Sequence, residues 1–160
     1  MISRMMQVVN TTDSLYLTPA QQKEVLDYGR SLQRRFAACR AVEAVEDDVV
    51  EAAKEAFFEQ HPNLSDITEN GWENFENDQR FALRTAIQSM LLDDLSFAEQ
   101  KHFRSLRRIM SFLEIPAVVQ NDWFSSLRTA LESRVKSEVT DTLAPYLDTF
   151  QPATTTATAR

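Results

Sequence analysis

Four residues in the middle of the chain could together hold a flat, conjugated ligand. Trp72 and Phe75 offer aromatic walls, and Asp78 and Arg84 follow with opposite charges. Aromatic walls with a polar anchor are what such a ligand requires of its pocket. In the alternative, Phe75 is a core residue and Asp78 is an exposed charge near a helix start, where the helix dipole favours an anion. The alternative is favoured, because charged side chains are mostly exposed.

Two histidines and one cysteine complete the candidate chemistry. His102 precedes Phe103 at the edge of an apolar helical stripe and could ligate a haem iron, although an ordinary surface histidine is the simpler interpretation. His61 suits a charge at a helix C-terminus. Cys39 lies between small residues, with nothing beside it that would obviously lower its pKa. A single cysteine cannot form an internal disulfide, which is typical of a reducing cytoplasm.

Catalytic and metal sites have no support in the sequence. No Ser-His-acid arrangement, glycine-rich phosphate loop or metal-ligand spacing is found, and Gly29 and Gly71 are the only glycines. We therefore expect a protein that is not an enzyme, with no catalytic residue and no metal site.

The charge balance narrows the class of partner. The net charge of −7 argues against general nucleic-acid binding, which needs clustered cations. Arg104, Arg107 and Arg108 share a helical face that could dock an acidic partner or a ligand carboxylate, although a solvated surface is the simpler account. No apolar run is long enough to cross a bilayer, and the first residues lack a signal-peptide core.

Helical periodicity dominates the pattern and predicts an all-α chain. Thr18-Pro19 predicts the start of a first long helix, the acidic residues 46–48 a second, and Asn70-Gly71 a turn within a loop over 62–72. We expect a third helix carrying Phe75 to end at Asp93-Asp94, and a fourth to be capped by Ser96. A fifth should start at Ile115-Pro116 and extend to Leu147, with an end or a kink at Pro145.

The two ends of the chain differ from its middle. Residues 1–15 contain an apolar patch, Met5, Met6, Val8 and Val9, which suits a short helix that needs a partner. Residues 151–160 contain no large apolar side chain and are expected to be disordered. The prediction is thus an N-terminal helical extension over 1–15, one domain over 16–150 and a disordered tail over 151–160.

Several short motifs, in a common order, resemble the phycobiliproteins, the globin-like subunits of the phycobilisome. They are Tyr16-Leu17-Thr18-Pro19, residues 58–62, Phe81-Ala82-Leu83-Arg84, residues 112–116 and residues 144–148. The resemblance covers about residues 10–150. It implies a globin-like helical bundle, preceded by an N-terminal helical extension that docks on a partner subunit.

The chain departs from that family at the position where its members attach their pigment. The family motif is cysteine, any residue, arginine, aspartate, and here Phe75, Asn77 and Asp78 stand at its three fixed positions. The resemblance therefore implies no covalent bilin, since Phe75 has no nucleophile. The aspartate that holds the pyrrole nitrogens in relatives is matched by Asp78, and an interface arginine is matched by Arg84. The docking segment also departs, with Leu15 at an arginine position.

These observations predict a phycobilisome-related binding or assembly protein without a covalent bilin. It could hold a bilin or other tetrapyrrole noncovalently, in a pocket formed by Trp72, Phe75, Asp78 and Arg84. The expected partners are phycobiliprotein subunits or further copies of the chain, and the expected location is the cytoplasm, at the thylakoid surface with phycobilisomes. The alternative is a sensor or regulatory globin domain that acts through protein–protein contacts.

Overall fold

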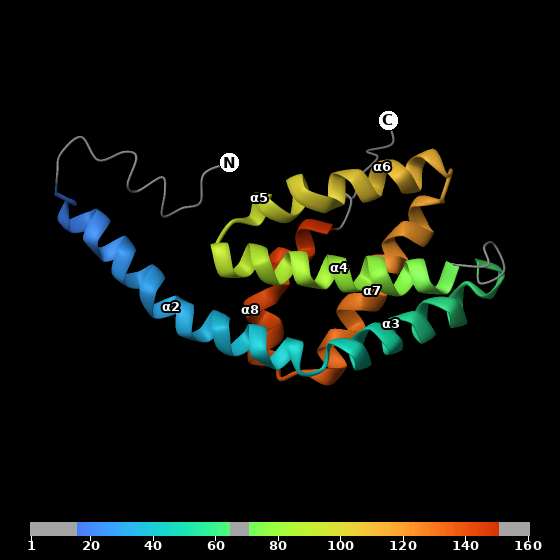
Figure 1. Ribbon diagram of the computed structural model, residues 1–160, viewed down its shortest axis with the longest axis horizontal. Helices are drawn as coiled ribbons and strands as arrows, with labels where there is room; N and C mark the ends of the chain where they lie inside the picture. Colours follow the sequence, from blue (N-terminus) through green and yellow to red (C-terminus); the bar gives the residue numbers. More distant parts are fainter. Residues whose placement is uncertain (1–15, 65–70, 151–160) are drawn as a thin grey trace, which may run out of the picture.

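The computed structural model describes residues 16–64 and 71–150, and every regular element in these ranges is a helix (Figure 1). The all-α prediction is therefore confirmed. The predictions of a helical extension over 1–15 and of a disordered tail over 151–160 concern residues outside the described ranges.

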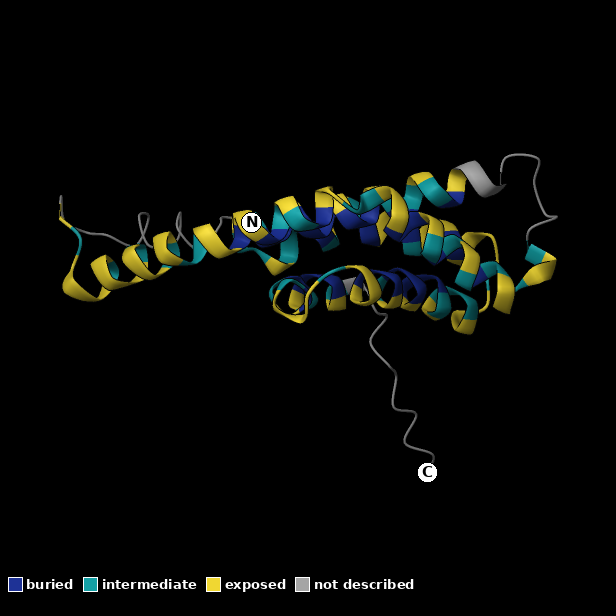
Figure 2. Ribbon diagram, turned by 90° about the horizontal axis from the view of Figure 1, so that it is seen from below, coloured by how far each residue is buried: buried dark blue, intermediate teal, exposed yellow. Residues whose placement is uncertain are grey.

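The first long helix, α2, spans Pro19–Glu43 and starts as predicted. The Thr18 hydroxyl accepts a hydrogen bond from the Gln21 backbone N–H, and the Gln21 side chain accepts one from the Thr18 N–H, which makes a capping box. The N-terminal half of α2 extends away from the other helices as an arm (Figures 1 and 2). The buried residues of α2 are Arg35, Ala38 and Val42, so only its C-terminal half enters the core.

Helix α3 spans Glu46–Gln60 and also follows the prediction. Three acidic residues occupy its first turn, where they interact favourably with the helix dipole. Its last turn closes with a hydrogen bond from the His61 N–H to the Phe57 carbonyl. A 3₁₀ turn, Pro62–Leu64, follows, because proline cannot continue the α-helix without a clash.

Helix α4, Gly71–Leu92, is the central element and carries small and medium apolar residues on its inner face. The fully buried members of that face are Ala82, Leu83, Ala86 and Met90. The helix ends at Asp93, whose φ of 53° is left-handed. Helix α5, Leu95–Ala98, is capped by Asp94, which accepts hydrogen bonds from the Ser96 N–H and hydroxyl. The prediction that Ser96 is the cap was wrong, because the carboxylate two residues earlier takes that role.

The remaining helices differ from the prediction in where they are interrupted. A π-helical segment, η2 at Glu99–Phe103, precedes α6, Arg104–Phe112. The predicted fifth helix is two helices, α7 at Ala117–Arg134 and α8 at Ser137–Leu147, which are separated by an extended Val135. Pro145 does not end α8, which continues for two residues before the 3₁₀ turn η3 at Asp148–Phe150.

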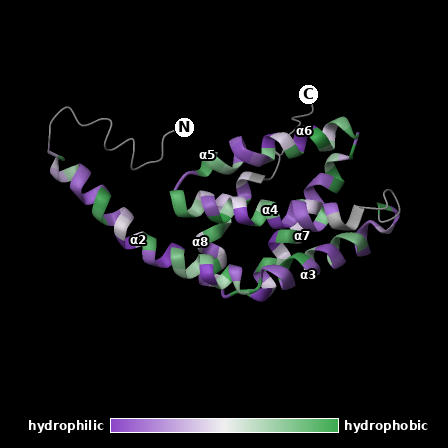
Figure 3. Ribbon diagram, viewed as in Figure 1, coloured by the Kyte–Doolittle hydropathy of each residue, from purple (hydrophilic) through white to green (hydrophobic). Residues whose placement is uncertain are grey.

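The core lies where the inner faces of α3, α4, α7 and α8 meet (Figure 2). Helix α3 packs along α7, while α4 contacts both α3 and α8. Purple and green residues alternate around most helices in Figure 3, as expected of amphipathic helices that bury one side. Within the described ranges, no helix is both long and apolar enough to cross a membrane.

Candidate functional site

Phe75 lies in the first turns of α4 and is buried, with only 7% of its surface exposed. Its ring centroid lies 5.0 Å from that of Phe57, 5.2 Å from that of Phe58 and 6.0 Å from that of Trp123. Offset and edge-on aromatic contacts at these separations stabilise a core beyond simple burial. The structure thus places Phe75 in an aromatic cluster shared by α3, α4 and α7.

Asp78 lies one turn further along α4 and is half-buried. Burial raises the pKa of its carboxyl group above the usual 3.8. In the described part of the chain, no hydrogen bond or ion pair to the Asp78 carboxylate is found. Asp78 is therefore a partly desolvated polar group on the flank of the core, and a ligand with hydrogen-bond donors would suit it.

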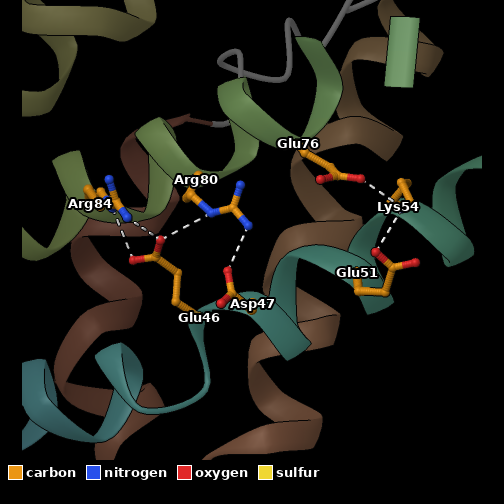
Figure 4. A network of polar contacts seen from close by, with 7 residues as sticks. All are labelled: Glu46, Asp47, Glu51, Lys54, Glu76, Arg80 and Arg84. Atoms are coloured by element: carbon orange, nitrogen blue, oxygen red, sulfur yellow. Dashed lines mark hydrogen bonds and ion pairs between the residues drawn. The ribbon is translucent and has the colours of Figure 1, made fainter. Parts of the chain in front are cut away.

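Arg84 points away from this flank, towards the start of α3 (Figure 4). Its Nη2 lies 2.6 Å from Oε1 of Glu46, and its Nε donates to Oε2 at 3.1 Å. Six residues place Arg84 about 120° around the helix from Asp78. The structure therefore does not bring Arg84 together with Asp78 in one pocket.

Further ion pairs join the same two helices beside Arg84 (Figure 4). Arg80 contacts Glu46 at 3.3 Å and Asp47 at 2.7 Å. Lys54 of α3 contacts Glu51 and Glu76 at 2.7 Å each. These pairs hold α3 against α4 along the seam that runs from the aromatic cluster of Phe75 towards the start of α3.

Trp72 belongs to the first turn of α4, and its side chain lies outside what the structure describes. Its predicted place in a pocket stays a prediction. A polar pocket of about 250 Å³ is formed elsewhere, between α2 and α8, and none of the four predicted site residues lines it. Its lining residues are Arg34, Ser137, Glu138, Asp141 and Thr142.

Phe81, three residues after Asp78 on α4, contacts His102, and the sequence alone did not connect these two residues. The two rings meet edge to face at 4.2 Å between centroids. His102 Nε2 is buried with no hydrogen-bond partner in the described structure, and burial lowers the pKa of the ring. The three-residue spacing of Asp78 and Phe81 on one helix could have signalled their common side. The sequence carries no signal for the π-helical turn that brings His102 against Phe81, although such turns are frequent at functional sites.

The three clustered arginines of α6 differ in exposure. Arg107 is half-buried and pairs with Glu99. Arg104 lies 3.9 Å from the same carboxylate and is largely exposed, and Arg108 is exposed. Docking of an acidic partner or a ligand carboxylate on this helix stays a prediction.

Metal coordination has no candidate in the described residues, where no group of three histidine, cysteine or acidic side chains converges. His102 lies against Phe81 and Phe103, at the edge of the core. Cys39 is half-buried on α2, and burial together with Glu43 raises the pKa of its thiol. The thiol is thus in its unreactive, protonated form at neutral pH, as expected for a packing residue.

The fold and site define an all-helical bundle with an aromatic core cluster and a half-buried acidic flank. Comparison with protein families gives a match over residues 7–153 to the family described as phycobilisome protein. The match spans most of the chain, so the protein belongs to the phycobilisome protein family, and the resemblance noted in its sequence is confirmed. The family's globin-like, all-helical fold agrees with the arrangement of α2 to α8. A search of curated proteins gave no match.

The resemblance noted in the sequence aligns Phe75 with the family's attachment cysteine, and the residues there do not fit a covalently attached bilin. Phe75 offers no sulfur, and its ring is enclosed by three other aromatic side chains. Asn77 is exposed and uncharged, so it cannot form the bidentate ion pair that an arginine forms with a propionate. Asp78 is the one residue of the motif that keeps both its type and a partly buried position.

Proposed function

We propose that the protein acts in the phycobilisome as a binding or assembly subunit that carries no covalent bilin. The observation that carries this proposal is the enclosure of Phe75 in the aromatic cluster, at the position where relatives present a thiol. In this proposal the protein acts in the cytoplasm, together with phycobilisomes at the thylakoid surface. It catalyses no reaction.

Where relatives carry a thiol, this chain carries the phenyl ring of Phe75. A thioether requires a thiolate, and a phenyl ring cannot supply one. The contacts of Phe75 with Phe57, Phe58 and Trp123 use that ring as a core element. Pigment attachment has thus been exchanged for packing, which leaves protein contacts as the function of the scaffold.

Helix α2 supplies a surface for such contacts. Its N-terminal half projects as an arm on which Leu26 is 59% exposed, and Phe36, on the half that enters the core, is 49% exposed. Exposed apolar side chains on a projecting element are typical of an interaction site. The proposed partners are phycobiliprotein subunits or another copy of this chain.

Co-expression with a bilin-synthesis pathway tests the proposal. The purified chain is run on a denaturing gel, and bilin fluorescence is recorded beside a pigmented family member expressed in the same cells. We expect fluorescence in the control band and none in this chain. In parallel, the chain should co-purify with phycobiliprotein subunits on native chromatography. A covalent band in this chain would contradict the proposal.

A second candidate function is noncovalent binding of a tetrapyrrole, and the half-buried Asp78 favours it. Asp78 would accept hydrogen bonds from pyrrole N–H groups, and Phe81 and His102 would provide an apolar wall. Native protein from the bilin-producing cells would then show a visible absorption band that is lost on denaturation. Asp78→Asn should weaken that band, while Arg84→Gln, on the other side of α4, should not. The absence of any band would support a regulatory domain that acts through protein contacts alone.

A further inference from the structure

The turn between α6 and α7 exposes a group of large apolar side chains, which we call the apolar corner. Its members are Ile109, Phe112, Leu113 and Val118, and they are 56%, 85%, 61% and 64% exposed. Figure 1 places this turn at the end of the bundle opposite to the projecting half of α2. Clustered apolar side chains on a surface mark contact with another protein or with a membrane.

The backbone holds the apolar corner in its exposed position. The Glu114 N–H donates to the Ser111 carbonyl at 3.1 Å, and the Ile115 N–H donates to the Met110 carbonyl at 2.9 Å. These two bonds form a Schellman motif, with Glu114 in the left-handed region at a φ of 55°. Ile115 then packs against the core. The apolar corner is therefore a preformed feature of the fold.

Cations precede the apolar corner along the same segment, and residues 101–113 contain no acidic residue. The cations are Lys101, Arg104, Arg107 and Arg108. Among the described residues, no ion pair is found for Lys101 or Arg108, whereas Arg107 pairs with Glu99. Arg104 and Arg108 lie two turns and one turn before Phe112 on α6, so both share its side of the helix.

The positive charge of this segment contrasts with the net charge of −7 of the whole chain. Acidic residues cluster elsewhere, for example in the first turn of α3. At physiological ionic strength the Debye length is about 8 Å, so a surface that touches the corner interacts mainly with the charges nearby. The local cations therefore favour an anionic partner.

An anionic lipid surface fits this corner better than a protein surface does. A specific protein interface takes about 20–30 residues on each side, many more than the corner offers. A lipid surface needs no matching shape, and it buries the apolar side of an element whose cations stay at the headgroups. Clusters of four or more cations beside apolar side chains are typical of contacts with anionic lipids. Such a contact also needs no helix that crosses the membrane.

We propose that the α6–α7 turn docks the protein on an anionic membrane surface. Phe112 and Leu113 enter the headgroup region, and Arg104 and Arg108 donate hydrogen bonds to lipid phosphates. The inference goes beyond the proposed function, because it adds a direct contact with lipid to the contacts with protein subunits. It rests on the exposed side chains of this corner, so its failure would leave the absence of a covalent bilin untouched.

Co-sedimentation of the purified full chain with vesicles tests the docking. Phosphatidylglycerol vesicles should bind the chain, and phosphatidylcholine vesicles should bind it about tenfold more weakly or less, since they carry no net charge. Raising the salt from about 0.1 M to about 1 M shortens the Debye length from about 10 Å to about 3 Å, so binding to the anionic vesicles should fall. A chain that ignores anionic vesicles, or binds both kinds equally, overturns the proposal.

Two variants assign the contact to the apolar corner and its cations. Each cation near an anionic surface contributes about fivefold to the affinity, so R104Q/R108Q should bind about 25-fold more weakly. Phe112→Ser removes an 85% exposed ring and should weaken binding about tenfold without changing the melting temperature. Unaltered vesicle binding by both variants would place the contact elsewhere and overturn the proposal.

Matched controls separate this corner from general charge and general exposure. R40Q/R134Q removes two exposed arginines from other helices, and Leu26→Ser removes an exposed apolar residue from α2. Both controls should bind the vesicles like the unaltered chain. Equal losses in R40Q/R134Q and R104Q/R108Q would overturn the assignment, because net charge alone would then explain the binding. Absent vesicle binding, together with binding of purified phycobiliprotein subunits that R104Q/R108Q abolishes, would assign the corner to a protein partner instead.

Discussion

Phe75 is the residue that the sequence resemblance aligns with the family's attachment cysteine, and the structure uses its ring as part of the core. It is 7% exposed and in contact with three aromatic rings. Asp78, which the same resemblance aligns with the family's aspartate, is half-buried on the flank of the core. The proposed loss of pigment attachment therefore rests on Phe75, and Asp78 is the proposed anchor for a ligand.

Truncation of Phe75 should be costly. Phe75→Ala removes a buried ring and leaves a cavity among Phe57, Phe58 and Trp123, so we expect a loss of about 3–5 kcal/mol in unfolding free energy. Phe75→Leu fills part of that cavity and should cost clearly less. Urea denaturation of both variants measures the difference. Equal and small losses would show that the ring is not a core element.

Replacement of Asp78 should stabilise the protein in a pH-dependent manner. Burial raises the pKa of Asp78 in the folded state, so the folded state loses stability as the pH rises from the unfolded value of 3.8 through the folded pKa. Asp78→Asn removes this ionisation. Its gain in melting temperature should therefore be larger at pH 7 than at pH 4. A gain that does not change with pH would contradict the assignment of a desolvated carboxylate.

Protonation of His102 should destabilise the folded protein when the pH falls below neutrality. Burial lowers its pKa in the folded state, so stability is fully present above the unfolded value of 6.5 and declines as the pH falls below it. His102→Leu should flatten the melting temperature between pH 7 and pH 5, compared with the unaltered chain. A decline of unchanged size in the His102→Leu variant would contradict the assignment of a buried, neutral ring.

At the scale of elements, a buried polar network fastens α2 to the C-terminal end of α4 and to α8. Arg35 Nη2 lies 2.9 Å from Oδ1 of Asp93, and the Tyr146 hydroxyl donates to the same oxygen at 2.9 Å. Burial and the bond to Asp93 raise the pKa of Tyr146 to about 12. The network therefore joins three helices at the residue whose left-handed backbone ends α4.

Replacement of Arg35 and replacement of Tyr146, which both contact Asp93, should lower the free energy of unfolding by different amounts. Arg35→Ala removes a buried guanidinium from the partly buried Asp93 carboxylate and should cost up to about 3 kcal/mol. Tyr146→Phe removes one hydrogen bond to a charged group and should cost about 1.5–3 kcal/mol. Arg84→Ala, which breaks an exposed pair with Glu46, should cost less than about 1 kcal/mol. Chemical denaturation of the three variants checks this order.

The sequence predicted those helix ends that depend on local chemistry and missed those that depend on packing. Thr18-Pro19, residues 46–48 and Asp93-Asp94 act through capping, dipole and turn chemistry, and all three boundaries are correct. The break at Val135 and the π-helical turn over 99–103 carry no glycine, proline or capping signal, so periodicity alone could not reveal them. For the same reason Phe81 and His102 were not connected, and Arg84 was grouped with Asp78 although the two face different helices.

At the scale of the whole molecule, different surfaces of the helices have different roles. The inner faces of α3, α4, α7 and α8 form the core, and α2 projects from it as an arm. Charges on the α3–α4 seam pair with one another, as Arg80 and Arg84 do with Glu46 and Lys54 does with Glu76. A phycobilisome family member with this distribution is suited to holding proteins together.

The presence or absence of a covalent pigment tests the central claim most directly. Chain purified from bilin-producing cells is denatured in detergent, separated on a gel and examined for bilin fluorescence next to a pigmented relative. We predict a fluorescent relative and a dark band for this chain, because Phe75 cannot form the thioether. Fluorescence that remains with this chain after boiling in detergent would contradict that prediction and, with it, the proposed exchange of pigment attachment for packing.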